Sequence, residues 1–227
     1  MFIGHYALGL ATKRVEPRLP LAMLLALPQV LDLLWPIFVL AGVERVEVAP
    51  GDTAFTPLRF VSYPWSHSLV MSMVWGVGLA AVVRARGAPV RAAGLVAALV
   101  VSHWILDVAS HRPDMPLWPG GGPMLGLGLW RSIPATLVVE IGMYAAGVAL
   151  YARATEPRDR TGTWAYAGLA GLLFVVYVAN LLGPPPPSAK AVAASALALW
   201  LIPLWGVWIE RHRVARAGPA TPAQGTG

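Results

Sequence analysis

The residues best able to do chemistry lie in the segment 102–111, where His103, Asp107 and His111 follow one another at intervals of four residues. On an α-helix, residues four apart share one face, with a drift of about 40° per step. An i, i+4 pair of His or carboxylate side chains on one helix is a recurrent way to bind zinc. The spacing therefore predicts a helix that presents metal ligands from one face.

Further titratable side chains in apolar sequence are candidates for the same site: His5, Asp32, His67 and Glu140. Such a side chain inside a bilayer is energetically costly and is a functional candidate by default. Any one of them, taken alone, is more often a hydrogen-bonded packing residue. Because four His and three acids would converge at one depth, packing accidents are a poor explanation and we expect a metal site. Imidazole and carboxylate in a chain without Cys favour Zn²⁺ over manganese, iron or nickel.

Composition indicates that membrane-spanning helices must position these residues. The chain has 227 residues, of which 57% are hydrophobic and only 12% charged, and its mean hydropathy is +0.62. A soluble domain carries about 25% charged residues, so a soluble enzyme and a disordered chain are excluded. The absence of Cys excludes a disulfide scaffold. Apolar stretches near the ~20 residues that cross a bilayer predict spans at 19–42, 66–83, 91–109, 133–152, 164–182 and 190–209.

The predicted fold is all-α: a polytopic membrane helix bundle of about six transmembrane helices plus a short N-terminal re-entrant helix. Residues 1–12 are apolar but too short to span, and an exposed end in lipid would leave backbone groups unsatisfied. We expect one integral membrane domain over 1–216, with a metal-site half at 1–153 and supporting helices at 164–210. The tail 217–227 has a disordered composition.

Basic residues predict the orientation. Twelve of the 17 Lys and Arg fall in four clusters, at 13–18, 84–91, 153–160 and 211–216, which the predicted spans place on one side of the membrane. The positive-inside rule then makes both termini cytoplasmic in a multi-pass protein of a bacterial-type inner (plasma) membrane. Topology thus explains the net charge of +6, and the expected partners are the lipid bilayer and a lipid-like substrate, with no nucleic acid.

Depth along the predicted helices places the candidate ligands in the outer half of the membrane. Counted from the cytoplasmic basic residues, Asp32 lies about 21 Å, His67 about 25 Å and His103 about 18 Å deep at 1.5 Å per residue. Two basic residues are expected near the outer ends of these helices: Arg112 and Arg131. They are candidates to neutralise the charge of a phosphate group; the simpler alternative is that their side chains extend to the membrane interface.

The remaining site residues complete this interpretation. Trp130 is a candidate to line the substrate site, and the candidate catalytic acids are Asp32, Asp114 and Glu140; Asp114 is also typical of a turn or a loop ion pair. The acids of the loop after the first span, Glu44, Glu47 and Asp52, are expected to be solvated. His212 lies between two Arg and is expected at the interface.

Four motifs resemble a known family: Gly4-His5-Tyr6-Ala7-Leu8-Gly9-Leu10, Gln29-Val30-Leu31-Asp32, Ser66-His67-Ser68-Leu69, and Ser102-His103 with Asp107. Together they resemble the inner-membrane metal-dependent hydrolases described as LexA-binding. The order His, Asp, His, His-x3-Asp over about residues 1–140 is also similar to zinc-dependent bacterial phospholipase C, in which His and Asp hold a three-zinc cluster. The resemblance implies hydrolysis of phosphodiester or related ester bonds. It maps the metal ligands onto His5, Asp32, His67, His103, Asp107, His111 and Glu140.

We therefore expect a membrane-embedded metal-dependent hydrolase, phospholipase C-like, that holds one to three zinc or other divalent ions and acts on a lipid or lipid-like phosphodiester or ester through a metal-activated water. One alternative is a metal-ion or proton transporter that uses the same His/Asp cluster as a transit site; another is a metal-stabilised scaffold. A transporter needs polar groups that continue to the opposite face. The cytoplasmic halves of the predicted spans offer almost none, which favours the enzyme.

Overall fold

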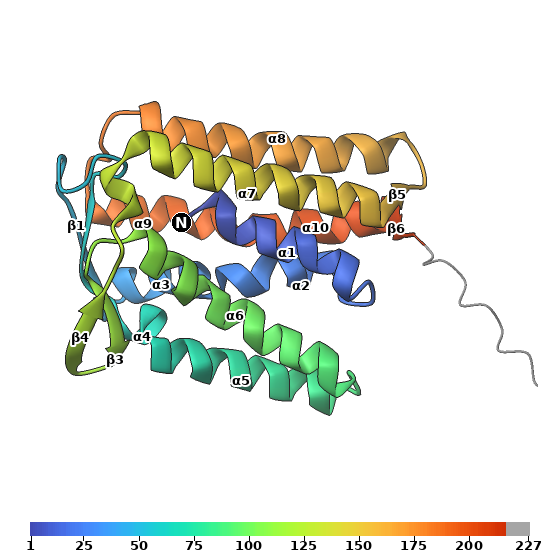
Figure 1. Ribbon diagram of the computed structural model, residues 1–227, viewed down its shortest axis with the longest axis horizontal. Helices are drawn as coiled ribbons and strands as arrows, with labels where there is room; N and C mark the ends of the chain where they lie inside the picture. Colours follow the sequence, from blue (N-terminus) through green and yellow to red (C-terminus); the bar gives the residue numbers. More distant parts are fainter. Residues whose placement is uncertain (217–227) are drawn as a thin grey trace, which may run out of the picture.

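The computed structural model describes residues 1–216, and most of them belong to helices that run along one common direction (Figure 1). The tail 217–227, with its predicted disorder, lies outside the described residues. The helices are α1 Ile3–Val15, α2 Leu21–Ala26, η1 Leu27–Gln29, α3 Val30–Leu40, α4 Pro64–His67, α5 Leu69–Ala85, α6 Val90–Ser110, η2 Leu129–Arg131, α7 Ile133–Ala154, α8 Arg160–Leu182, α9 Ala189–Ala196, η3 Leu197–Trp200 and α10 Leu201–His212. The strands are β1 Arg45–Val48, β2 Leu58–Ser62, β3 Met115–Trp118, β4 Gly121–Leu125, β5 Thr155–Pro157 and β6 Arg213–Ala215.

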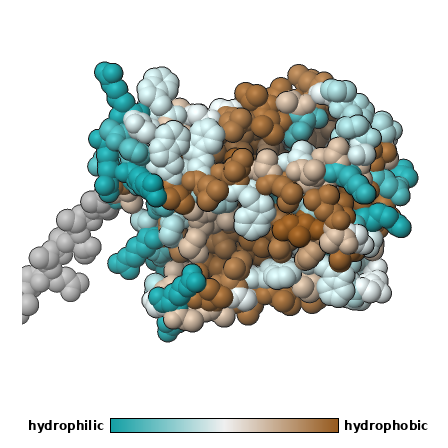
Figure 2. All heavy atoms as spheres, turned by 180° about the vertical axis from the view of Figure 1, so that it is seen from behind, coloured by the Kyte–Doolittle hydropathy of each residue, from teal (hydrophilic) through white to brown (hydrophobic). Residues whose placement is uncertain are grey.

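Within residues 1–216, five helical segments are long and apolar enough to cross a membrane: Leu21–Leu40, Val90–Ser110, Ile133–Ala154, Arg160–Leu182 and Ala189–His212. These five match predicted spans; the remaining predicted span coincides with α5, which is apolar but has only 17 residues. Large apolar side chains stay exposed along these helices, as at Val77, Val138 and Leu204. Figure 2 shows a hydrophobic band across the middle of the face in view, with hydrophilic residues toward both ends. This surface is that of a membrane protein.

The four basic clusters lie at the same end of the bundle. Lys13 Nζ donates to Glu210 Oε1 at 2.9 Å, which joins the end of α1 to the end of α10. Arg91 donates to the Val15 carbonyl at 3.0 Å, which brings the start of α6 to the same place. There β5 pairs with β6, so the residues before α8 are tied to those after α10 (Figure 1).

At the opposite end, two loops fold into hairpins that the all-α prediction did not include. Antiparallel pairing joins β1 to β2 with Val46 opposite Phe60, and β3 to β4 with Met115 opposite Leu125. In β1 the buried Val46 alternates with the exposed Arg45 and Glu47, as a strand with one covered face requires. The fold is therefore mainly helical, with short sheets closing both ends.

Side-chain caps explain where several long helices begin. Ser68, Ser132, Asp159 and Ser188 each precede an apolar helix, and each accepts a hydrogen bond from the backbone N–H three residues later. A cap of this kind satisfies one of the N–H groups that a helix leaves free at its start. Polar residues in the loops therefore determine where these helices begin, although the helices themselves are almost wholly apolar.

The first span is broken in its middle, where η1 separates α2 from α3. Pro28 has no N–H, so the Leu24 carbonyl lacks the helical donor four residues ahead. Helix α1 packs across this break at Gly9, where a Cβ atom would lie only 1.9 Å from the Leu24 oxygen. A second close approach occurs at Gly147 of α7, whose Cβ would lie 2.6 Å from the Ala7 backbone.

Helix α1, Ile3–Val15, corresponds to the short helix predicted over 1–12, and most of its residues are buried between its neighbours. Met1 lies inside the bundle and away from the basic end (Figure 1), whereas Arg216 lies near that end beside β5. Helix α1 therefore inserts its first turn into the bundle, with its last turn at the basic end.

Candidate metal centre

Five of the predicted ligands meet inside the bundle and form what we call the His/Asp cluster: His5, Asp32, His67, His103 and Asp107. They come from α1, α3, α4 and α6, with His103 and Asp107 one turn apart on α6. The donor atoms form two overlapping groups, each with all atoms within 4.8 Å of one another, and His103 belongs to both. The side chain of Asp32 is 27% exposed, while those of the other four are almost fully buried.

Asp107 is at the centre of the cluster. Its Oδ1 lies 3.1 Å from His5 Nε2, and its Oδ2 lies 3.0 Å from His103 Nε2 and 3.8 Å from His67 Nε2. Asp32 Oδ1 faces the same two imidazoles, 3.4 Å from His67 Nε2 and 3.9 Å from His103 Nε2. Two carboxylates and three imidazoles therefore converge on one small volume.

The backbone break at η1 fixes the ring of His103. Its Nδ1 lies 2.7 Å from the Pro28 carbonyl oxygen, which can only accept a hydrogen bond, so Nδ1 carries the proton. The Nε2 atom makes no hydrogen bond with any described residue, although it is buried and close to Asp107. Neutral His103 thus presents a lone pair to a carboxylate, a contact that becomes favourable with a second proton or with a cation between them.

His67 is oriented by a relay of two further side chains. The Glu44 carboxylate accepts a hydrogen bond from Ser66 Oγ at 2.7 Å, so the Ser66 oxygen is left to accept one from His67 Nδ1 at 2.6 Å. The proton of His67 is then on Nδ1, and Nε2 again faces the carboxylates of the cluster. Partners that hold the outer nitrogen of a ligating His are typical of metal sites.

Glu44 corrects the expectation that the first loop's acids are all solvated. It is 3% exposed and also accepts the backbone N–H groups of Trp65 and Ser66. Asp52 is likewise engaged, with hydrogen bonds from Arg59 and Arg112, whereas Glu47 is exposed as expected. The first turn of α4 supplies the donors that make burial of the Glu44 carboxylate acceptable.

Glu140 lies outside both groups, at the start of α1. Its Oε2 accepts the Phe2 N–H at 2.8 Å, while its buried Oε1 has no hydrogen-bond partner among the described residues. The Met1 amino group contacts Asp107 Oδ1 at 2.5 Å, so one oxygen of that carboxylate already has a cationic neighbour. The other oxygen, Oδ2, is the one that faces His67 and His103.

His111 also lies outside the two groups, although it is buried beside Tyr63 and Trp130. Its Nδ1 is 3.0 Å from Asp114 Oδ1, and Arg112 donates to Asp114 Oδ2 at 3.0 Å. Burial lowers the pKa of His111, which keeps the imidazole neutral. Burial would raise the pKa of Asp114, but hydrogen bonds from His111 and Arg112 lower it. Burial also raises the pKa of Tyr63 well above its usual range.

The predicted substrate-binding residues occupy different environments. Arg112 is paired with Asp52 and Asp114, and Arg131 is exposed beside Gly128. Trp130 is buried and stacks against Phe55.

The loop 126–128, which joins β4 to η2, passes directly over the end of α6, because the Leu127 and Gly128 N–H groups donate to the Val108 and His111 carbonyls. A Cβ at Gly126 would lie 2.0 Å from the Arg112 oxygen, so only glycine fits this crossing.

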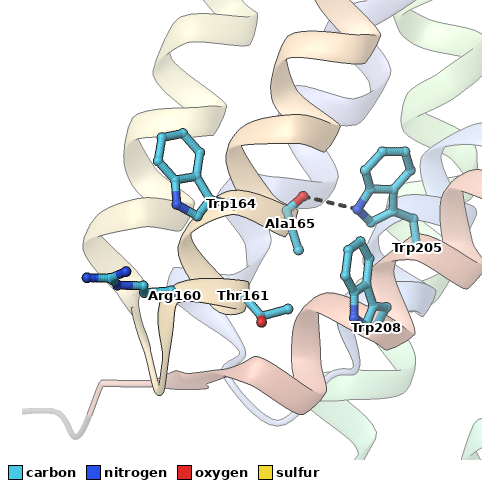
Figure 3. A pocket seen from close by; sticks show the side chains of 6 residues that line it. All are labelled: Arg160, Thr161, Trp164, Ala165, Trp205 and Trp208. Carbon is cyan, nitrogen blue, oxygen red and sulfur yellow. Dashed lines mark hydrogen bonds between the residues drawn. The ribbon is translucent and has the colours of Figure 1, made fainter.

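A cavity of about 880 Å³, here called the lateral cavity, opens from the His/Asp cluster. Its wall includes Asp32, His67, Asp107 and His111, and continues along apolar side chains of α3, α8, α9 and α10. A second pocket of about 300 Å³ lies between α8 and α10 at the basic end. Figure 3 shows its three Trp side chains and the hydrogen bond from Trp205 Nε1 to the Ala165 carbonyl; no His or carboxylate lines it within the described chain.

The donor set suits a divalent ion such as zinc. Imidazole nitrogen and carboxylate oxygen are both zinc ligands, and two of the imidazoles are held so that Nε2 faces the carboxylates. No family model, curated protein or solved structure matches this chain. The assignment of function therefore depends on the geometry of this site.

Proposed function

We propose that this protein is a membrane-embedded metal-dependent hydrolase that acts on a lipid or lipid-like ester or phosphodiester. The observation that carries the proposal is the arrangement of His67 and His103, whose Nε2 atoms face Asp32 and Asp107 at 3.0–3.9 Å while their Nδ1 protons are held elsewhere. Lone pairs and carboxylates in this arrangement repel one another unless a proton or a metal cation lies between them, and a metal cation satisfies several of these donors at once.

The side chains of the cluster would hold either one ion, through four or five donor atoms, or two ions. In the second case His103, which belongs to both groups, would bind only one of the two ions, because its free imidazole nitrogen can bind a single ion. When bound, a divalent ion of this kind lowers the pKa of a water molecule and polarises an ester or phosphoryl oxygen. His5, His103 and Asp107 are deeply buried and would serve to hold the ion. His67 and Asp32 complete the second group on the side of the lateral cavity.

Asp32 is the carboxylate best placed to act on a substrate. It is the most exposed member of the cluster, and it lines the lateral cavity. It can therefore orient a water molecule and accept its proton while the buried groups stay fixed. Glu140 caps the start of α1 and Asp114 holds His111, which supports positioning roles for both.

For membrane placement, we propose that the basic end is cytoplasmic, that α5 is the sixth span and that α1 is re-entrant. In a bacterial-type inner membrane this places the cluster toward the outer leaflet. The transporter alternative is less well supported, because buried apolar side chains separate the cluster from the Lys13–Glu210 pair: Tyr6 and Leu10 on α1 and Leu21 and Leu25 on α2.

The test is metal analysis and turnover in lipid nanodiscs. We expect about one or two equivalents of zinc or a similar ion, and release of product from long-chain phosphodiester or carboxylic ester substrates that stops with chelator and returns with zinc. Asp32→Asn should abolish turnover, whereas Glu47→Gln, on the exposed face of β1, should not.

Two results would contradict the proposal and favour one of the alternatives. Metal flux into sealed vesicles, lost in Asp32→Asn and without product release, would establish the transporter. A chelator that lowers only the thermal stability, in protein without turnover of either substrate class, would establish the scaffold.

A further inference from the structure

The size and lining of the lateral cavity indicate which kind of ligand can reach the cluster. At about 880 Å³ it is near the upper end of the ~300–1,000 Å³ typical of small-molecule sites. One wall contains three members of the His/Asp cluster, Asp32, His67 and Asp107, together with His111. The other walls are largely apolar, with Trp35, Leu173 and Ile202 among their buried residues. The cavity is therefore much larger than an ion and its water shell require.

The cavity reaches the apolar outer surface of the bundle. Leu172, Val176 and Leu201 line it and are nevertheless 39%, 37% and 61% exposed, so they form its lateral mouth between α8 and the helix formed by α9 and α10. These residues belong to two segments with the length and apolar character of membrane spans. A ligand that enters here comes from the hydrocarbon layer of the bilayer.

The charges along the cavity define the chemistry of the ligand. Among the described residues that line it there is no Lys or Arg, and its ionisable groups other than Tyr177 and the Met1 amine are those of the cluster and His111. Arg112 is committed to Asp52 and Asp114. Burial in this cavity is therefore favourable for an apolar chain. A strongly anionic headgroup would find no basic side chain there apart from the histidines of the cluster and His111.

We propose that the lateral cavity binds the hydrocarbon chain of a long-chain amphiphile with a small uncharged or singly charged headgroup, and that the headgroup linkage lies against Asp32 and His67. This rests on the proposed function only for the reaction at the linkage, since binding of the chain requires no metal. Acyl and isoprenoid chains share this chemistry, and paired probes distinguish them.

The two walls of the cavity are fixed to the rest of the bundle, so the site is preformed. Trp200 Nε1 donates to the Leu33 carbonyl at 3.2 Å, which holds η3 against α3. Trp205 Nε1 donates to the Ala165 carbonyl at 3.0 Å, which holds α10 against α8 (Figure 3). A chain can therefore enter the cavity without a large rearrangement of these helices.

The test measures binding without catalysis, in chelator-treated protein in nanodiscs. The probe is hexadecylglycerol ether, which has no ester to hydrolyse, and native mass spectrometry follows its saturable binding. We expect binding that saturates at one per chain, a much weaker signal for the hexyl ether, and weaker binding of hexadecyl phosphate. A geranylgeranyl glycerol ether beside the hexadecyl compound shows which chain is preferred.

Neighbouring residues of α8 supply matched variants. Val176 lines the cavity, whereas Val175 is 61% exposed and is not part of its wall. Val176→Trp should weaken hexadecylglycerol ether binding at least about tenfold, a loss of about 1.4 kcal/mol, and Val175→Trp should leave it unchanged. On α9, Ala196→Leu and the exposed Ala194→Leu repeat the comparison should Val176→Trp fail to fold.

Equal binding by both members of each pair, binding that never saturates, or preference for the alkyl phosphate would overturn the inference. Failure of the hydrolysis assay with intact chain binding would instead reject the proposed reaction and leave this cavity assignment standing.

Discussion

Ser66 Oγ donates a hydrogen bond of 2.7 Å to Glu44 Oε2, and through this contact a carboxylate from the first loop controls a histidine of the cluster. His67 Nδ1 lies 2.6 Å from the same hydroxyl oxygen. The chain Glu44–Ser66–His67 fixes both the tautomer and the ring orientation of His67, as carboxylate–histidine pairs do at metal sites.

Glu44→Gln should therefore weaken metal binding about 10- to 100-fold, the usual effect of removing an outer partner of a ligating His. The measurement is competition for zinc with a chromogenic chelator. Glu47→Gln is the matched control, because Glu47 lies in the same strand and is exposed. Equal zinc affinity in the two variants would show that the relay does not serve a metal.

Removing a central ligand should have a larger effect. His103→Ala and Asp107→Ala are expected to lower zinc occupancy to near zero by elemental analysis, because each side chain contacts at least two other members of the cluster. His212→Ala should keep full occupancy, since His212 is at the far end and pairs with Asp159. Loss of zinc in all three variants would point to general unfolding instead.

The close crossing of α1 over the broken first span predicts a sharp steric effect. Gly9→Ala places a Cβ 1.9 Å from the Leu24 oxygen and should destabilise the protein by about 1–3 kcal/mol. Gly78→Ala, in α5 with open space around it, should instead be neutral or stabilising by up to about 1 kcal/mol. Unfolding in mixed detergent micelles measures both, and similar stabilities for the two would contradict the crossing.

A hydrogen-bonded carboxylate at the basic end predicts a dependence of stability on pH. Asp159 accepts hydrogen bonds from His212 Nδ1 at 2.7 Å and from the Gly162 N–H at 2.8 Å, and these lower its pKa below the ordinary value of 3.8. Since the folded-state pKa is depressed, the stabilisation is present above pH 3.8 and is lost as the pH falls through the folded-state value. Asp159→Asn keeps a capping side chain without the charge, so the difference in thermal stability between wild type and variant should disappear at low pH. A difference that persists unchanged there would contradict this assignment.

Two glycine turns allow the orientation to be tested. Gly87 joins α5 to α6 at the basic end, and Gly120 joins β3 to β4 at the other; both have positive φ and open space around them. A reporter that is active only in the cytoplasm should give signal when inserted at Gly87 and none at Gly120. The reverse pattern would invert the proposed topology.

The sequence was most informative where spacing and depth determine position. The i, i+4 relation of His103 and Asp107 is found in α6 as predicted. Depth likewise predicts the convergence of His5 on α1, Asp32 on α3 and His67 at the end of the short helix α4. His111 and Glu140 have the right depth but bond to Asp114 and to the start of α1 instead. Depth alone does not specify which way a side chain points.

Glu44 shows why the remainder of the site could not be predicted. Its neighbours in sequence are exposed, and its partners Trp65 and Ser66 lie about twenty residues away across a hairpin. The only local signal is Pro64 opening a short helix, whose first N–H groups need an acceptor. Which carboxylate accepts these hydrogen bonds depends on how the loop folds back onto α4. The conformation of a loop produces no periodic sequence pattern from which this could be predicted.

The pairing of β5 with β6 has a mechanical consequence for α8 and the helix that follows it. The strands clamp these two segments together at the basic end, and Trp205 continues the grip as far as Ala165. Toward the Pro184–Pro187 turn the same two segments stand apart around the cavity. These two segments are therefore joined at both ends, by the β5–β6 pair at the basic end and by the chain itself at residues 183–188. A hydrocarbon chain from the bilayer would thus enter between helices whose ends are held together, and the width of that entrance depends on the side chains between the two ties.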